Sequence, residues 1–214
     1  MVSAHVVSVN VGAAREVEWF GRVVTTAIWK APVAGPVAVG DVNLDGDEQA
    51  DLRVHGGPDK AVYAYAAEDY QWWSQAEGVA GDPFGPGTFG ENLTTSGVDV
   101  TDALIGDRWN IGDVVLEVAQ PREPCFKLGI RMGDAAFKDR FAHARRPGAY
   151  LRIITGGTVE AGMSIGITPA ARPAVGIWEL VGDEVPSDLM ERVRADSRVP
   201  DGWRRAFERM SRGS

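Results

Sequence analysis

The feature that most constrains the fold is a succession of short β-type runs separated by Gly, Pro and Asp. Eight such runs are visible, and tight turns such as Gly106-Asp107 and Gly112-Asp113 separate several of them. Many short strands joined by tight turns are typical of a β-barrel or sandwich. We therefore expect a mainly β, barrel-like fold over residues 5–167. The predicted strands are His5–Val11, Arg22–Ile28, Val37–Leu44, Ala61–Ala66, Asp107–Ile111, Val114–Gln120, Ala149–Thr155 and Met163–Ile167.

A few helices interrupt this pattern. Glu68–Glu77 has apolar residues at helical spacing, and Asp134–Ala144 begins with a good N-cap residue and ends before Pro147-Gly148. The stretch from Gly78 to Gly90 is rich in Gly and Pro, and we expect a long loop there.

The character of the sequence changes after Thr168. Residues 168–186 are predicted to form a linker or arm, with Ala174–Val181 as a last strand or an extended segment. Residues 187–214 predict a helical hairpin, capped at Ser187 and Asp201. A hairpin this short must pack on the barrel or on a second subunit. We expect a homodimer, because an apolar stripe with Trp203 and Phe207 needs cover.

Composition excludes several classes of protein. The net charge is −8, which argues against nucleic-acid or anionic-membrane binding. No run approaches the roughly 18 apolar residues that a membrane span requires. The single cysteine rules out an intramolecular disulfide and a cluster held by four thiolates of one chain. These facts predict a cytoplasmic protein.

Four motifs contain side chains that can bind ligands or take part in catalysis. The first is Gln120–Leu128, where Cys125 follows Pro124 and is flanked by the cations Arg122 and Lys127. Pro124 suits the first position of a helix, so Cys125 is expected in its first turn, a setting that favours the reactive thiolate. A buried structural cysteine is the alternative.

The other three motifs are weak when taken singly. The second motif is His55-Gly56-Gly57 with Lys60, where two glycines would let the backbone approach an anion closely. A solvated Gly-Gly turn accounts for the same residues equally well. Asn92, after Gly90-Glu91, offers amide donors and acceptors, or else belongs to a capped turn. Lys30 follows a predicted strand and would lie at a barrel mouth, unless it is a surface lysine.

Together these motifs resemble the MOSC domain, named after the C-terminal domain of molybdenum cofactor sulfurases, and its standalone bacterial YiiM-like branch. The resemblance covers roughly residues 5–167, and the residues 187–214 resemble the three-helix appendage of that branch. The motifs that carry it are Ala27–Lys30, Gly46–Asp51 with His55–Gly57, Lys60–Tyr63, Phe89–Leu93, Ile105–Asp107 and Gln120–Arg122 with Pro124-Cys125.

The resemblance implies a pocket for the molybdenum cofactor, with Cys125 as the metal ligand. The cofactor-binding residues would be Lys30, His55, Gly56, Gly57, Lys60, Asn92 and Arg122. It also implies reduction of N-hydroxylated compounds, such as hydroxylamino purines and amidoximes, with His55 as proton relay. The sequence has no flavin or dinucleotide motif, so an external flavin-type reductase would supply the electrons. A cofactor carrier without chemistry, or a thiol protein that handles sulfur or hydrolyses acyl bonds with Cys125 and His55, stays open as an alternative.

Overall fold

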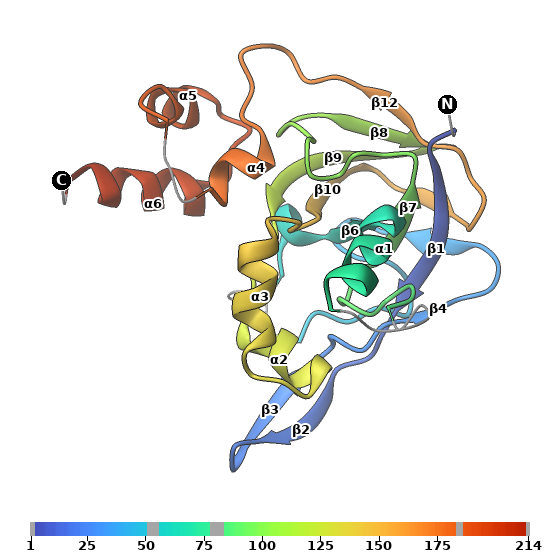
Figure 1. Ribbon diagram of the computed structural model, residues 1–214. Coiled ribbons are helices and arrows are strands. Elements are labelled where there is room, and N and C mark those ends of the chain that lie inside the picture. Colours follow the sequence, from blue (N-terminus) through green and yellow to red (C-terminus); the bar gives the residue numbers. More distant parts are fainter. Residues whose placement is uncertain (1–2, 51–55, 78–83, 183–185, 213–214) are drawn as a thin grey trace.

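The computed structural model describes residues 3–50, 56–77, 84–182 and 186–212, and the side chains as far as residue 209 (Figure 1). Strands dominate the first 168 residues, as predicted, and helices dominate the rest. The strands are β1 His5–Val11, β2 Arg15–Trp19, β3 Arg22–Thr26, β4 Ala31–Pro32, β5 Val37–Val39, β6 Val62–Ala66, β7 Leu93–Ser96, β8 Arg108–Ile111, β9 Val114–Pro121, β10 Ala149–Thr155, β11 Gly157–Val159 and β12 Gly166–Thr168. The helices are η1 Pro58–Lys60, α1 Ala67–Ala76, α2 Phe126–Met132, α3 Phe137–Ala144, α4 Ile177–Leu180, α5 Leu189–Ala195 and α6 Asp201–Arg212.

Eight strands form one curled sheet in the order β12-β8-β9-β10-β6-β7-β1-β4. All neighbours are antiparallel except β6 and β7, which run parallel because α1 crosses between them. Two small sheets, β11-β5 and β2-β3, complete the β structure. The β2-β3 hairpin projects away from the body of the molecule (Figure 1). The predicted barrel-like fold is therefore confirmed.

Two apolar clusters hold these elements together. The larger one fills the inside of the curled sheet with aliphatic residues such as Val9, Val62 and Leu116, all at most 1% exposed. The second is aromatic and lies where α1 and α3 cover the sheet beside the loop that ends at Asn92. In it Trp73 and Phe141 stack with ring centroids 5.8 Å apart. This aromatic cluster supports the pocket described below.

The C-terminal helices pack on the barrel of the same chain. Leu189, Val193 and Phe207 are at most 3% exposed and belong to the larger cluster. Phe207 is thus covered within one chain, whereas Trp203 of the same stripe stays partly exposed, and the homodimer remains a prediction. No helix in the described ranges is long and apolar enough to cross a bilayer.

Several local predictions were wrong. The residue before α5 is Asp188 and not Ser187, and Asp201 lies inside α6 instead of capping it. Ala174–Val181 contains the short helix α4 instead of a strand, because Glu179 accepts a hydrogen bond from the amide of Gly176 (2.8 Å) and starts a helical turn. The strand predicted at Val37–Leu44 ends at Val39, where the chain turns so that Leu44 pairs back with Val39. Cys125 precedes α2 as its N-cap residue, with extended backbone, so Pro124 lies outside the helix.

Candidate functional site

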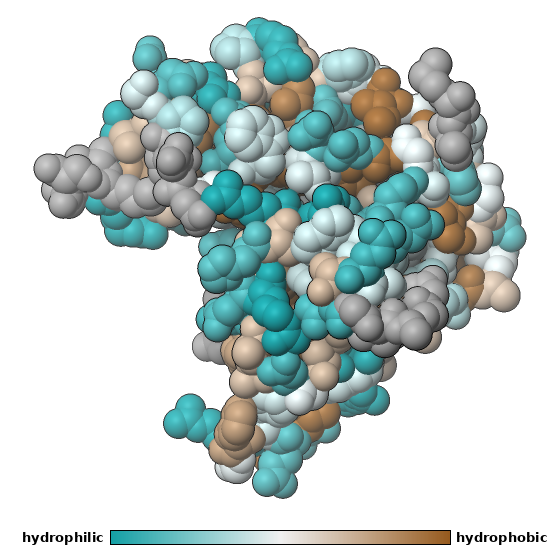
Figure 2. Space-filling view, viewed as in Figure 1, coloured by the Kyte–Doolittle hydropathy of each residue, from teal (hydrophilic) through white to brown (hydrophobic). Residues whose placement is uncertain are grey.

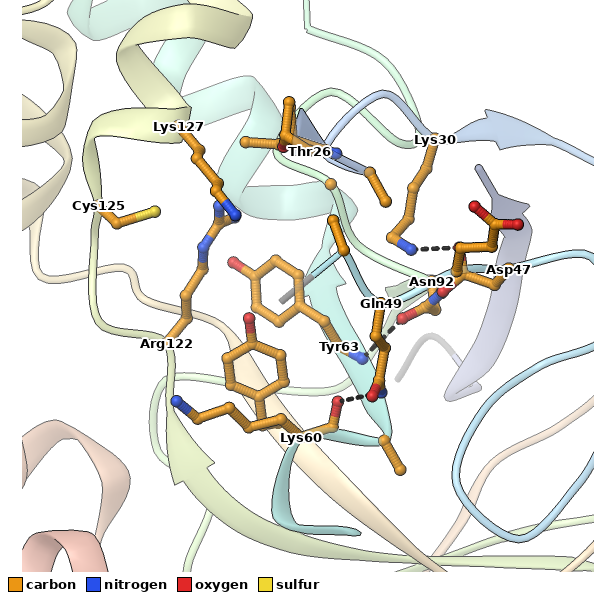
Figure 3. A pocket seen from close by; sticks show the side chains of 17 residues that line it. Thr26, Lys30, Asp47, Gln49, Lys60, Tyr63, Asn92, Arg122, Cys125 and Lys127 are labelled. Carbon is orange, nitrogen blue, oxygen red and sulfur yellow. Dashed lines mark hydrogen bonds and ion pairs between the residues drawn. The ribbon is translucent and has the colours of Figure 1, made fainter. Parts of the chain in front are cut away.

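One pocket gathers most of the chemically active side chains (Figure 3). Its cavity volume is small, about 80 Å³, and it opens to solvent. Six segments that are distant in the sequence form its wall, so it depends on the tertiary fold. The lining residues are Thr26–Ile28, Lys30, Asp47–Ala50, Lys60, Ala61, Tyr63, Gly90, Asn92, Arg122, Cys125, Lys127 and Tyr150.

Cys125 lies on the segment that joins β9 to α2. Its side chain is half-buried, and its sulfur points toward the space that Arg122 and Lys127 also face (Figure 3). Lys127 is only 9% exposed. Its ammonium forms no hydrogen bond or ion pair with the residues that the structure describes. A thiol and two buried cations therefore meet in one place.

Arg122 is held in a fixed orientation. Its side chain is 6% exposed and donates a hydrogen bond to the carbonyl oxygen of Phe89. Its guanidinium carbon lies 4.9 Å from the ring centre of Tyr63 and 5.8 Å from that of Phe141. The aromatic cluster thus supports a planar cation at the edge of the pocket.

Two tyrosines form the apolar wall of the pocket. Tyr63 on β6 pairs with Tyr150 on β10, and their ring centroids are 5.1 Å apart. The Tyr63 hydroxyl donates to the carbonyl oxygen of Pro147 (2.8 Å). Burial raises the pKa of both phenols, so both stay protonated at neutral pH. The ammonium of Lys60 lies 5.9 Å from the ring centre of Tyr150.

The charge of Lys30 is balanced by a neighbouring carboxylate. It forms a buried ion pair with Asp47, and the two side chains are 9% and 2% exposed. Burial lowers the pKa of Lys30, and the ion pair with Asp47 opposes that shift. Asp47 also accepts hydrogen bonds from the amide of Gly12 (2.9 Å) and from Nδ2 of Asn92 (2.9 Å).

Asn92 connects three elements. Its Oδ1 accepts from the amide of Tyr63 (3.1 Å), and its Nδ2 donates to Asp47 and to the carbonyl oxygen of Asn10 (3.3 Å). Its amide group is therefore used within the fold, and it positions the wall of the pocket.

Comparison with known proteins identifies the family. A family model described as MOSC domain matches residues 51–166. This chain belongs to the MOSC domain family.

Several relatives cover most of the chain. The uncharacterized protein YflK of Bacillus subtilis is 32% identical over 206 residues, which are 94% of this chain and 92% of that protein. Protein YiiM of Escherichia coli is 28% identical and covers 86% of this chain and 84% of its own length. A protein of Gibberella moniliformis named reductase is 34% identical over 154 residues, 72% of this chain but 27% of the fungal protein.

Solved structures agree with this assignment. The crystal structure of YiiM from Geobacillus stearothermophilus superimposes with a TM-score of 0.77 at 29% identity and covers 96% of this chain and 98% of that one. The crystal structure of YiiM from Escherichia coli, at 22% identity and a TM-score of 0.75, shares the fold and covers 98% of this chain and 92% of its own. The chain is thus a YiiM-like member of the MOSC family.

The MOSC motif residues do not all reach the pocket. Lys30, Lys60, Asn92, Arg122 and Cys125 line it together, whereas Gly56 and Gly57 do not belong to its wall in the ranges that the structure describes. Gly57 instead has a φ of 91°, and its amide donates a hydrogen bond to Oε1 of Gln49 (3.2 Å). This contact fixes the turn before Lys60. His55 lies outside the described residues. The ligand roles assigned to all of these residues stay predictions.

Sequence reasoning missed several residues of the pocket as site residues. Asp47, Gln49 and Tyr63 stand inside the motifs already quoted, so the motif signal was available for them. Tyr150 lies in none of the motifs, and its place in the pocket follows only from its pairing with Tyr63 in the sheet. Lys127 was noted as a neighbouring charge of Cys125 and proves to be a buried part of the wall.

Proposed function

We propose that this chain binds the molybdenum cofactor around Cys125 and reduces N-hydroxylated compounds with electrons from an external flavin-type reductase. The observation that carries the proposal is the meeting of the Cys125 thiol with the buried side chains of Arg122 and Lys127 in one pocket. Membership of the MOSC family and similarity to a fungal protein named reductase support it.

The donor set fits an anionic cofactor that carries a soft metal. A thiolate is a suitable ligand for such a metal, and buried cations bind phosphate by charge-assisted hydrogen bonds. Lys30 is already paired with Asp47, so Arg122 and Lys127 are the better candidates for the anionic groups. Because the cavity volume is only about 80 Å³, the pterin would have to extend out of the pocket toward solvent.

When bound, the molybdenum centre would supply the two electrons that cleave the N–O bond. The balanced reaction joins R–NHOH, two electrons and two protons to give R–NH2 and water. The chain's own residues would bind and orient the reactants: Cys125 would hold the metal, and Arg122 would fix the cofactor's negative charge. The Tyr63–Tyr150 pair would keep water away from one side. His55 would relay protons, as its motif predicts.

A dye-linked assay tests this proposal. Protein from molybdate-supplied cells is mixed with reduced viologen and an N-hydroxylated purine or an amidoxime. We expect turnover by the wild type and its loss in Cys125→Ser. His55→Gln should slow turnover and change its pH profile, whereas His143→Gln, an exposed histidine on α3, should not.

The same assay separates the proposal from its alternatives. Cofactor-loaded wild-type protein that reduces none of these compounds would contradict it and favour a carrier. Trapping of Cys125 by an alkylating agent in active, molybdenum-free protein would favour a thiol enzyme.

A further inference from the structure

Two clefts beside the pocket are lined by Trp203 of α6: one lies between α6 and the barrel, and the other between α3 and the end of α4. Their cavity volumes are about 360 and 390 Å³, within the range of sites that hold small organic ligands (roughly 300–1,000 Å³). Trp203 and Glu123 line both clefts. The outline of the molecule is indented here, between the C-terminal helices and α3 (Figure 2).

Both clefts share residues with the pocket around Cys125. Lys60 lines the pocket and the first cleft, and Arg122 lines the pocket and the second. Glu123 and Pro124 connect Arg122 to Cys125 along the chain. The clefts therefore lie directly beside the pocket, next to the body of a molecule whose reactive end enters it.

Trp203 presents a fixed aromatic surface to the clefts. Its Nε1 donates a hydrogen bond to Oε1 of Gln120 (2.9 Å), and Nε2 of Gln120 donates to the carbonyl oxygen of Asp59 (3.0 Å). Its ring lies 6.4 Å from that of Phe207, while the indole stays partly exposed. A ring whose polar atom is satisfied inside the protein offers its remaining surface for stacking.

Glu123 adds a polar preference. Its side chain is exposed, and the described residues give its carboxylate no hydrogen bond or ion pair. An ionised carboxylate only accepts hydrogen bonds, so it favours ligands that carry N–H donors. An indole and a carboxylate together suit a flat heterocycle with an amino-substituted edge, because bases stack on aromatic rings and exocyclic amines donate to carboxylates.

We propose that Trp203 and Glu123 form a subsite for the flat, N–H-bearing heterocycle of the substrate. The inference rests on the proposed function, because it assigns the body of an N-hydroxylated aminopurine-type substrate to the α6 clefts. The C-terminal helices thereby contribute to substrate selection as well as to the fold.

Binding to cofactor-free protein tests the subsite without any turnover. Calorimetric titration with adenine should give measurable binding to the wild type, roughly ten- to hundredfold weaker binding to Trp203→Leu, and weaker binding to Glu123→Gln. Trp178→Leu is the matched control, since Trp178 on α4 is 50% exposed and lines neither cleft. It should bind adenine like the wild type. Glu123 is exposed, so Glu123→Gln keeps the test valid if Trp203→Leu does not fold.

Failure to bind adenine, or binding that neither variant weakens, would overturn the subsite. Turnover by loaded protein distinguishes this failure from that of the proposed function. With the subsite present, Trp203→Leu raises KM for a hydroxylaminopurine about tenfold and leaves KM for a small aliphatic amidoxime unchanged. If both KM values are unchanged, the subsite is wrong and the reductase activity stands. If the wild type reduces neither compound but binds adenine through Trp203, the proposed function is wrong and the subsite stands.

Discussion

At the scale of single residues, the pocket depends on how its charges are held. Arg122 is a buried cation, fixed by the carbonyl of Phe89 and by two aromatic rings. Lys30, in contrast, is balanced by Asp47. The motifs predicted that both would face one site, and they do. The sequence could not show that one charge is neutralised, because Asp47 reaches Lys30 only through the tertiary fold.

Arg122→Lys tests the fixed orientation. Lysine keeps the charge but loses the planar contacts with Tyr63 and Phe141, so we expect the free energy of unfolding to fall by about 1–3 kcal/mol. Arg140→Lys is the control, because Arg140 lies 5.1 Å from the ring centre of Phe137 but is 41% exposed. Its cost should stay below about 0.5 kcal/mol in the same urea titration. Equal losses in the free energy of unfolding for the two variants would show that the buried contacts of Arg122 add nothing to stability.

Glu91 is a buried acid that braces the loop behind Arg122. It accepts hydrogen bonds from the amides of Gly87 (2.6 Å) and Phe89 (3.2 Å) and from the hydroxyls of Thr94 (2.8 Å) and Tyr70. Burial raises the pKa of Glu91 above its usual value, although these hydrogen bonds oppose the shift. The loop that carries the Phe89 carbonyl therefore depends on a carboxyl group whose ionisation is costly.

This raised pKa has a definite sign in stability measurements. The folded state binds the proton of Glu91 more tightly than the unfolded state, so its contribution is greatest below about pH 4.3 and is lost as pH rises through the folded pKa. Glu91→Gln removes this titration. The stability of the wild type minus that of the variant, measured in urea at a series of pH values from about 4 to 8, should fall as pH rises. A constant difference would contradict the assignment.

At the scale of elements, the bounds of two strands could be predicted from their apolar, β-branched runs. His5–Val11 and Ala149–Thr155 match β1 and β10. The strand β7 was missed, because Leu93, Thr94 and Thr95 are all buried and leave no alternation. Its parallel partner β6 is also distant in the sequence, since Leu93 pairs with Ala64, 29 residues earlier. The α4 turn depends on Glu179, which Arg192 holds from α5 (2.5 Å), a contact that no local pattern reveals.

Phe141→Ala tests the aromatic support of the pocket. Phe141 on α3 is 1% exposed and packs on Trp73, Phe89 and the guanidinium of Arg122. We expect a loss of about 3–5 kcal/mol in the free energy of unfolding, because a large cavity would remain. Phe126→Ala, on the exposed side of α2 with 50% exposure, should cost far less. Similar losses at the two sites would argue against a packed aromatic cluster.

At the scale of the whole molecule, the C-terminal helices and the barrel share one core. The sequence predicted that these helices need a packing partner, and the structure supplies it within the same chain. Leu189→Ala should therefore lower the midpoint of a single unfolding transition and cost about 2–5 kcal/mol. A separate early transition confined to the helices would show that they unfold on their own.

The central claim is that Cys125 and its neighbouring cations hold a molybdenum cofactor. The most direct test is molybdenum and pterin analysis of protein purified from molybdate-supplied cells, with Cys125→Ser and Arg122→Met compared with the wild type. The account predicts near-equimolar molybdenum and pterin in the wild type, loss of molybdenum in Cys125→Ser, and loss of pterin in Arg122→Met. Wild-type protein that carries neither, or variants that retain both, would contradict it.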